Sequence, residues 1–461
     1  MVFSSITFLF YFLPIVIAIY YIVPSKVKNI VLLISSLFFY FYGEPTYVII
    51  MVISIVITYI FGLLMDKYPK HKKTFLTLSI VTTVGILVYF KYFNFLLDNV
   101  NMWLTHKIDF VYVALPIGIS FYTFQLISYI VDVYRGEAKV QKNLLKLATY
   151  IALFPQLIAG PIVRYTTIEN QLEKREHSFS KFSLGVRKFV IGLGKKVLIA
   201  NILGELANKF LSSTDTSTLF YWLYGISNML HIYFDFSGYS DMAIGLGKMF
   251  GFDFLENFNY PYVATSITDF WRRWHISLSS WFRDYIYIPL GGNRVSKIKW
   301  LRNILIVWLL TGLWHGAAWN FIIWGIYFGI LLILEKVFLG KVLEKLPKFI
   351  SRIYVLLIVM ISFIIFSRST TGEILQNIGG LFGINVDSFM SLESIYYLKS
   401  YIIVIILGII GATTIPKRIV TNAKLQKITS ILEPIFLLLI LVISTSYIID
   451  STFNPFLYFR F

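Results

Sequence analysis

YVIIMVISIVITYIFGLLM, residues 47–65, is an apolar run without a charged side chain. A bilayer core of roughly 30 Å is crossed by about 20 such residues in a helix, so this run predicts a membrane-spanning helix. Similar runs lie at 6–23, 75–90 and 110–133. With 57% hydrophobic and 14% charged residues, the chain is more apolar than a soluble globular protein needs to be. The predicted fold class is therefore all-α, a polytopic integral membrane protein. Its first run is expected to be retained, because PSKVKN follows it instead of a small-residue cleavage site.

The formal net charge of +17 is carried mainly by short loops between the apolar runs. That placement argues against nucleic-acid binding, which needs basic residues gathered on one folded surface. The loop 43–46 contains no lysine or arginine, whereas the loop 66–73 contains four. Under the positive-inside rule, the alternation predicts an outer amino terminus and cytoplasmic loops at 24–29, 66–73 and 134–146. Such a basic cytoplasmic face suits anionic lipid headgroups or an anionic donor.

The chain has no cysteine, which excludes thiol catalysis, disulfides and cysteine-bound metal. Its six histidines stand at 71, 106, 177, 231, 275 and 315, so no two have the close spacing of a metal site on one helix. We therefore expect neither a bound metal nor another bound cofactor.

No repeat, low-complexity tract or long linker divides the chain, so residues 1–461 are expected to form a single membrane domain. Proline and glycine interrupt the apolar runs at 114–125 and 154–164, and glycine at 235–247. Irregular backbone at membrane depth is tolerated where protein or a water-filled cavity satisfies the freed groups, so this part should form the functional interior. The basic region 164–196 is expected to lie along the cytoplasmic surface, with its cations snorkelling to the interface.

The segment NFNYPYVATSITDFWRRWHISLSSWFRDYIYIPLGGNR, residues 257–294, combines aromatic periodicity with charge. Large apolar residues recur at spacings of three and four, as on one face of a helix, at Trp271, Trp274, Leu278 and Trp281. The charge, which no lipid-facing span accepts, comes from Arg272, Arg273 and Arg283. We predict an interfacial or re-entrant helix whose aromatic face packs inward. It carries His275, either as a structural hydrogen-bonding group or as a chemical one.

A second histidine of interest lies in TGLWHGAAWNFIIWG, residues 311–325. An ionisable side chain within an apolar run is costly and usually faces a cavity or a partner. Helical spacing places Thr311, His315 and Trp319 on one face. Gly312 and Gly316 let another backbone or a substrate come close. His315 therefore either faces a reactive cavity or joins two helices by a hydrogen bond.

Further polar residues lie at membrane depth. Asp235 is one helical turn after His231, and Asp241 follows SGYS. Either acid can orient a histidine or hold the broken helix by hydrogen bonds, and the structural role is favoured. Asn320 and Gln125 are interpreted as cavity polar groups or contacts between helices.

Two long segments carry a family resemblance. FDFSGYSDMAIGLGKMFGFDFLENFNYPYVATSITDFWRRWHISLSSWFRDYIYIPLGGNR, residues 234–294, followed by LTGLWHGAAWNFIIWG, residues 310–325, resembles the membrane-bound O-acyltransferase (MBOAT) family. Within that family the chain is most similar to bacterial proteins that acetylate alginate and other exopolysaccharides. The opening MVFSSITFLFYFLPIVIAIYY is also similar to theirs, so the resemblance covers about residues 1–330. The remainder, 335–461, is apolar and less distinctive.

The resemblance implies a ring of about eleven spanning helices, with re-entrant and interfacial helices, around a central tunnel. It also implies that His315 is the family's intramembrane catalytic histidine and that His275, in WHISLS, is the second family histidine. To a donor or substrate site we assign Arg272, Arg273, Arg283, Trp319, Asn320 and Asp241.

The implied activity is transfer of an acetyl group from a cytoplasmic thioester towards hydroxyls of an extracytoplasmic polysaccharide, directly or through a partner acetyltransferase. The expected donor is acetyl-CoA or an acyl carrier protein, and the expected location is the bacterial cytoplasmic membrane. An imidazole can take the proton of the attacking hydroxyl, and His275, an indole N–H or a backbone amide can stabilise the oxyanion. Two alternatives stay open, D-alanyl transfer to teichoic acid and a transporter or flippase. A transporter is expected to show an internal repeat, which the sequence lacks.

Overall fold

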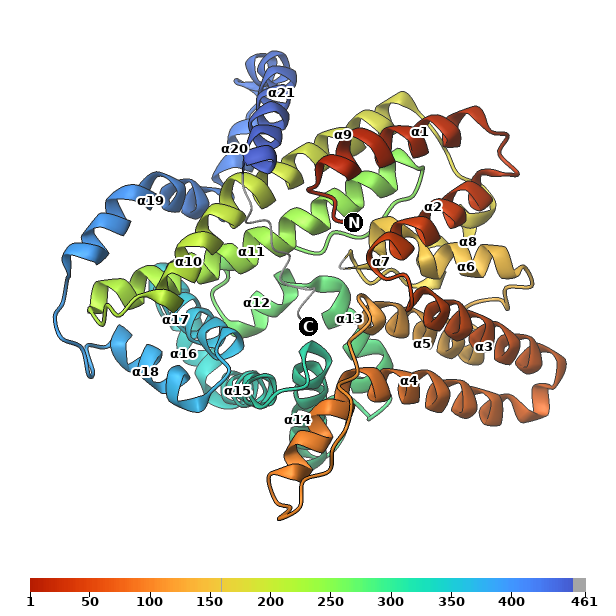
Figure 1. Cartoon of the computed structure of the whole chain (residues 1–461), viewed down its shortest axis with the longest axis horizontal. Helices are drawn as coiled ribbons and strands as arrows, with labels where there is room; N and C mark the ends of the chain where they lie inside the picture. The colour runs from red at the N-terminus through yellow and green to blue at the C-terminus, as the bar shows by residue number, and fades with distance from the viewer. Residues whose placement is uncertain (159, 451–461) are drawn as a thin grey trace. The chain divides into compact units, whose positions relative to one another are not determined.

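The computed structural model describes residues 1–158 and 160–450, and it consists of helices joined by loops (Figure 1). No strand occurs in this described part, so the all-α class is confirmed. Within it, six helical stretches are long and apolar enough to cross a membrane: Val48–Lys67, Pro69–Asn101, Trp319–Lys345, Lys348–Ser367, Leu392–Gly411 and Gln426–Asp450. Two shorter apolar stretches are Thr7–Ile22 and Lys28–Gly43. The chain is thus a multi-pass membrane protein, while the expected count of about eleven spans stays a prediction.

The chain divides into two compact units. The first comprises residues 1–189 and 242–255, and the second comprises 190–241 and the chain from 256 onward. Helices α9 (Phe179–Gly194) and α11 (Thr218–Met249) contribute residues to both units.

The first unit begins with a π-helical segment that continues into a regular helix, as the apolar run 6–23 predicts. Its elements are η1 (Thr7–Phe12), α1 (Leu13–Ile22), α2 (Lys28–Gly43), α3 (Val48–Lys67), η2 (Pro69–His71), α4 (Lys72–Asn101), α5 (Ile119–Arg135), α6 (Leu144–Ala152), α7 (Phe154–Leu157) and α8 (Tyr165–Glu173). Helices α3, α4 and α5 pack together and lie side by side in Figure 1. Buried aromatic rings fill the core, where Phe8 lies 5.9 Å from Phe39 and 6.2 Å from Phe154.

The prediction of a helix over 110–133 is wrong in its first third. Helix α5 begins only at Ile119, and residues 109–116 are not helical. Pro116 lacks a backbone N–H, and Gly118 adopts φ 76, which a residue with a Cβ avoids. A Cβ at Gly118 would also lie 2.8 Å from the carbonyl oxygen of Leu157, so the close approach of these two segments requires glycine.

The second unit carries both histidines of interest. Its elements are η3 (Lys195–Asn201), α10 (Ile202–Ser212), η4 (Pro261–Val263), α12 (Ile267–Arg273), α13 (Ile276–Phe282), η5 (Arg283–Tyr287), α14 (Lys297–His315), α15 (Trp319–Leu334), η6 (Glu335–Leu339), α16 (Gly340–Lys345), α17 (Lys348–Ser367), α18 (Thr371–Leu381), α19 (Leu392–Gly411), α20 (Ile415–Val420) and α21 (Gln426–Asp450). Helices α14 and α15 form an antiparallel hairpin, and α15 packs in turn on α17.

The basic region 164–196 does not lie along the surface over its whole length, which corrects the prediction. Its last two lysines, which are the first two residues of η3, point inward. Lys196 is 1% exposed and pairs with Asp235 at 2.5 Å, while Lys195 pairs with Asp241 at 2.6 Å. A lipid-facing lysine avoids the cost of burying its ammonium group by snorkelling to the interface. Here the acids of α11 offset that cost by pairing with the two ammonium groups.

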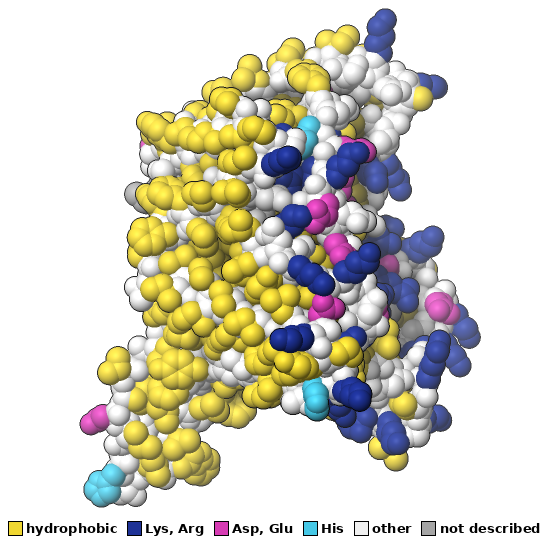
Figure 2. Space-filling view, turned by 90° about the vertical axis from the view of Figure 1, so that its right-hand side faces the viewer, with side chains coloured by type: hydrophobic (Ala, Val, Ile, Leu, Met, Phe, Trp, Pro, Cys, Tyr) yellow, Lys and Arg dark blue, Asp and Glu magenta, His cyan; other side chains and the backbone are white. Residues whose placement is uncertain are grey.

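Large hydrophobic side chains remain exposed on many helices. Examples are Ile22, 82% exposed, Leu392, 89% exposed, and Ile403, 70% exposed. Figure 2 shows hydrophobic side chains covering much of one face, with Lys and Arg side chains gathered to one side of them. In water such a surface would be an aggregation hazard, whereas it suits contact with lipid chains.

Candidate active site

His315 is the last residue of α14, not the middle of a continuous span. Gly316 and Ala318 are fully extended, and α15 starts at Trp319. The predicted face of Thr311, His315 and Trp319 is therefore wrong, because the helix ends before Trp319, which is 58% exposed. His315 itself is buried, with its ring 4.9 Å from that of Trp314, 5.0 Å from Trp324 and 5.2 Å from Phe366.

Glycines bring the two arms of the α14–α15 hairpin together. Gly312 and Gly325 face each other across the hairpin. A Cβ added to either glycine would lie 3.3 Å from the Cα atom of the other. A Cβ on Gly312 would also come within 2.3 Å of the carbonyl oxygen of Phe321, and one on Gly316 within 2.1 Å of its ring. The expectation of a close neighbouring backbone is confirmed for Gly312, where that backbone belongs to α15, whereas Gly316 instead packs against the ring of Phe321.

His275 lies between two short helices, α12 and α13, so the predicted single helix over this segment is wrong. Helix α12 ends at Arg273, Trp274 is extended, and the backbone of His275 has φ 44, a left-handed conformation that separates α12 from α13. The inward aromatic face is nevertheless confirmed, because the four residues that define it are at most 8% exposed: Trp271, Trp274, Leu278 and Trp281. His275 is 0% exposed, and its ring stands edge-on to Phe236 at 4.6 Å.

Asn257 fixes the tautomer of His275. The Asn257 Oδ1 atom accepts hydrogen bonds from the backbone N–H of Ser277 at 3.1 Å and from its hydroxyl at 2.9 Å. The same oxygen lies 3.2 Å from Nδ1 of His275, so Nδ1 must be the donor. A neutral imidazole that donates through Nδ1 keeps its lone pair on Nε2. Among the described residues, that buried Nε2 has no hydrogen-bond partner.

Trp314 links the two histidines within the second unit. Its ring lies 5.9 Å from His275 and 4.9 Å from His315. The structure therefore brings together both residues that the sequence predicts as catalytic. Asn257 and Trp314 were not identified from the sequence, although NFNYP and the W of LWHG stand beside the motifs and would have been reasonable candidates.

A cavity of about 320 Å³ lies in the same unit as this pair; its walls are mainly aromatic and aliphatic, and neither histidine lines it. Trp271, Trp308 and Thr311 line it, with Arg283 and Lys336 as the cationic side chains. The rings of Trp271 and Trp308 are 4.6 Å apart. Trp324 contacts Trp271 at 5.7 Å and His315 at 5.0 Å, so one layer of indole separates the cavity wall from His315.

The structure gives the other predicted site residues different places. Arg283 lines the cavity and pairs with Asp284 at 2.6 Å. Arg272 is exposed, and Arg273 pairs with Asp269 at 2.9 Å. Asn320 donates to the carbonyl oxygen of Phe366 at 2.9 Å. Asp241 is paired with Lys195. Among the predicted donor-site or substrate-site residues, those that do not line the cavity are Arg272, Arg273, Asn320, Asp241 and Trp319.

Metal ligands do not assemble in the described part of the chain. No group of three or more His, Asp or Glu side chains there has the arrangement needed to hold an ion.

The second unit of this all-helical membrane fold thus contains two buried histidines and an aromatic-lined cavity. The chain belongs to the membrane-bound O-acyltransferase family, MBOAT, which matches residues 34–367. The resemblance and the predicted enzyme class, an O-acyltransferase, are thereby confirmed.

Individual relatives extend the match beyond this range. The chain is 38% identical to a protein of Azotobacter vinelandii described as "Probable alginate O-acetylase AlgI", over 100% of both chains. It is 34% identical to the peptidoglycan O-acetyltransferase of Helicobacter pylori, over 84% of this chain and 80% of that one. It is 33% identical to the teichoic acid D-alanyltransferase of Bacillus subtilis, over 47% of this chain and 58% of that one.

Proposed function

We propose that this chain moves an acetyl group from a cytoplasmic thioester towards hydroxyls of an extracytoplasmic polysaccharide, in a bacterial cytoplasmic membrane. The observation that carries the proposal is the pair of buried histidines, His275 and His315, that share the ring of Trp314. The relatives with alginate and peptidoglycan acetylation in their names cover most or all of the chain. The D-alanyltransferase covers less than half of it, which favours acetyl over D-alanyl transfer.

In the proposed reaction His315 acts as the general base. Its imidazole takes the proton as the acceptor oxygen attacks the thioester carbonyl carbon, which gives a tetrahedral oxyanion. The carbon–sulfur bond then breaks, and the imidazolium returns its proton to the leaving thiolate. The product is an ester of the acceptor and a free thiol. The same steps apply if the first acceptor hydroxyl belongs to a partner acetyltransferase.

The oxyanion is proposed to be stabilised by an indole. The Nε1–H of Trp324 is buried and has no acceptor among the described residues, and its ring contacts His315. An unsatisfied buried donor is costly, and a developing negative charge on a neighbouring oxygen would satisfy it. Neutral His275 presents a lone pair on Nε2, so it is better suited to accept a proton or orient an acceptor hydroxyl than to donate to the oxyanion.

The cavity is proposed to receive the donor. Its apolar walls suit the arm of a CoA or carrier-protein thioester, and Arg283 and Lys336 suit the donor's phosphate groups. Arg272 and Arg273 lie outside the cavity and are proposed as interfacial anchors. Acetyl-CoA is the simplest donor with this chemistry.

The function is tested with purified protein given acetyl-CoA and an acceptor glycan. We expect release of free CoA thiol and an acetyl ester on the glycan, or on a partner acetyltransferase when that protein is added. Turnover with a D-alanyl carrier protein and none with acetyl-CoA would replace this proposal with the D-alanyl alternative.

Removing the cavity arginine tests the donor site. Arg283→Ala should raise KM for acetyl-CoA about tenfold, because one charge-assisted contact to phosphate is lost. Arg272→Ala, on the same segment but outside the cavity, is the matched control and should leave KM unchanged. Equal effects of the two substitutions would remove Arg283 from the donor site.

A further inference from the structure

A nearly buried lysine in the first unit has no counter-charge among the residues that the structure describes. Lys28, the first residue of α2, is 9% exposed. Its ammonium lies 4.7 Å from the ring centre of Tyr20 and 5.1 Å from that of Tyr21. Within the described chain it makes no ion pair or hydrogen bond. Aromatic faces attract an ammonium but do not accept its N–H groups as an anion would.

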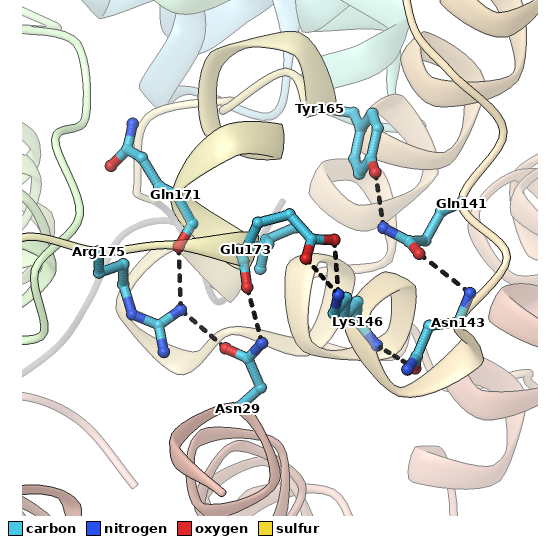
Figure 3. Close-up of polar contacts among 9 residues, drawn as sticks. Asn29, Gln141, Asn143, Lys146, Tyr165, Gln171, Glu173 and Arg175 are labelled. Atoms are coloured by element: carbon cyan, nitrogen blue, oxygen red, sulfur yellow. Dashed lines mark hydrogen bonds and ion pairs between the residues drawn. The ribbon is translucent and has the colours of Figure 1, made fainter. Parts of the chain in front are cut away.

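Arg175 brings a second cation to the same aromatic ring. Its guanidinium lies 5.8 Å from the ring centre of Tyr20, and its Nε donates to the Tyr20 hydroxyl at 3.0 Å. Figure 3 shows the guanidinium held by Asn29, whose Oδ1 accepts from Nη1 at 2.7 Å, and by the carbonyl oxygen of Gln171. These bonds fix its orientation, and Nη2 has no partner among the described residues.

Two acidic side chains of this part of the chain are already paired with other lysines, and Glu176, beside Arg175 in sequence, is exposed. Glu173 pairs with Lys146, as Figure 3 also shows, and Asp253 pairs with Lys181 and Lys248. Burial lowers the pKa of His177, and the charges of Lys28, Arg175 and Lys181 lower it further. The ring of His177 is hydrogen-bonded to the Tyr20 hydroxyl. Uncompensated positive charge therefore accumulates around Tyr20.

Exposed apolar side chains flank the same segments. Ile22 is 82% exposed at the end of α1, and Phe179 is 89% exposed at the start of α9. A ligand that combines a phosphate with hydrocarbon chains would satisfy both features, whereas a soluble phosphate would leave the apolar side chains uncovered.

We propose that Lys28 and Arg175, held on the aromatic ring of Tyr20, bind the phosphate of an anionic phospholipid headgroup. Lys28 and the free Nη2 of Arg175 donate to the phosphate oxygens, while Tyr21 and Ile22 contact the acyl chains. This lipid site uses none of the residues of the histidine pair and does not depend on the acyl-transfer proposal.

The test is lipid retention by the detergent-purified protein, measured by native mass spectrometry with phosphatidylglycerol or phosphatidylcholine added at equal concentration. Wild-type protein should retain phosphatidylglycerol in preference. Lys28→Met, which keeps the apolar stem, should reduce that retention about tenfold, because one charge-assisted contact is lost. Arg175→Gln should reduce it similarly, and the thermal unfolding temperature of each variant shows whether it is folded.

Lys26→Met is the matched control, since Lys26 is exposed in the loop that precedes α2, two residues before Lys28, and its replacement should not change retention. Equal retention of the two lipids, or unchanged retention by folded Lys28→Met protein, would overturn the proposal. Displacement of phosphatidylglycerol by millimolar inorganic phosphate would show that the site takes a free phosphate in place of a lipid headgroup, which also contradicts it.

Discussion

Asn257 shows how one amide can define the chemistry of a buried histidine. Its oxygen accepts the backbone N–H of Ser277, which excludes the flipped amide, because a nitrogen in that place would be a second donor. Nδ1 of His275 therefore donates, and Nε2 is left as the basic atom. The left-handed backbone at His275 lets its ring reach this amide from the gap between α12 and α13. We infer that Asn257 is a positioning residue.

Replacing Asn257 tests that role. Asn257→Leu removes the acceptor and should lower kcat for acetyl transfer about tenfold or more, with little change in KM for the donor. Asn257→Asp keeps an acceptor for Nδ1, so it should retain more activity and shift the pH dependence of kcat upward, because a carboxylate stabilises the imidazolium. Asn259→Ala, two residues away and exposed, is the control. If the Asp and Leu variants lose activity equally with unchanged pH profiles, Asn257 has only a structural role.

At the scale of elements, the sequence predicts what is buried better than where helices break. Apolar periodicity correctly places Trp271, Trp274, Leu278 and Trp281 inside. Periodicity does not reveal the break at His275, because a left-handed residue leaves the spacing unchanged. The end of α14 at His315 is hidden for a different reason. The apolar run continues through the extended residues and into α15, so nothing in the pattern marks the end of the helix. Burial of Lys195 and Lys196 depends on acids of α11 distant in sequence, so local pattern favours snorkelling instead.

The glycine contact of the α14–α15 hairpin has a direct consequence for the site. Gly312→Ala would drive a methyl group into the carbonyl of Phe321, so α14 must shift and carry His315 with it. We expect a loss of about 1–3 kcal/mol in stability and reduced transfer activity. Gly85→Ala in α4 is the matched control, because nothing lies within 4 Å of its added Cβ. Alanine is the better helix former, so that control should be neutral or slightly stabilising in thermal unfolding. Unchanged stability of Gly312→Ala protein would show that the hairpin can open without cost.

At the scale of the whole molecule, the multi-pass membrane character follows from composition, and the orientation is a prediction from loop charge. The cysteine-free chain allows each loop to be labelled singly. A cysteine at Lys70, in η2, should be protected from an impermeant thiol reagent in intact cells. A cysteine at Trp103, 91% exposed in the loop after α4, should be modified. The reverse pattern would place the basic loops outside and would require the donor to enter from the other side.

The central claim is that the imidazole of His315 moves the proton of acyl transfer, and one substitution tests it most directly. His315→Gln keeps a hydrogen-bonding side chain of similar size but cannot accept a proton at neutral pH. In purified protein that is folded by thermal unfolding, acetyl transfer from acetyl-CoA should fall by about 10²- to 10⁴-fold, with donor binding retained. Near-normal transfer by folded His315→Gln protein would contradict the account, because His315 would then serve only to join α14 to its neighbours.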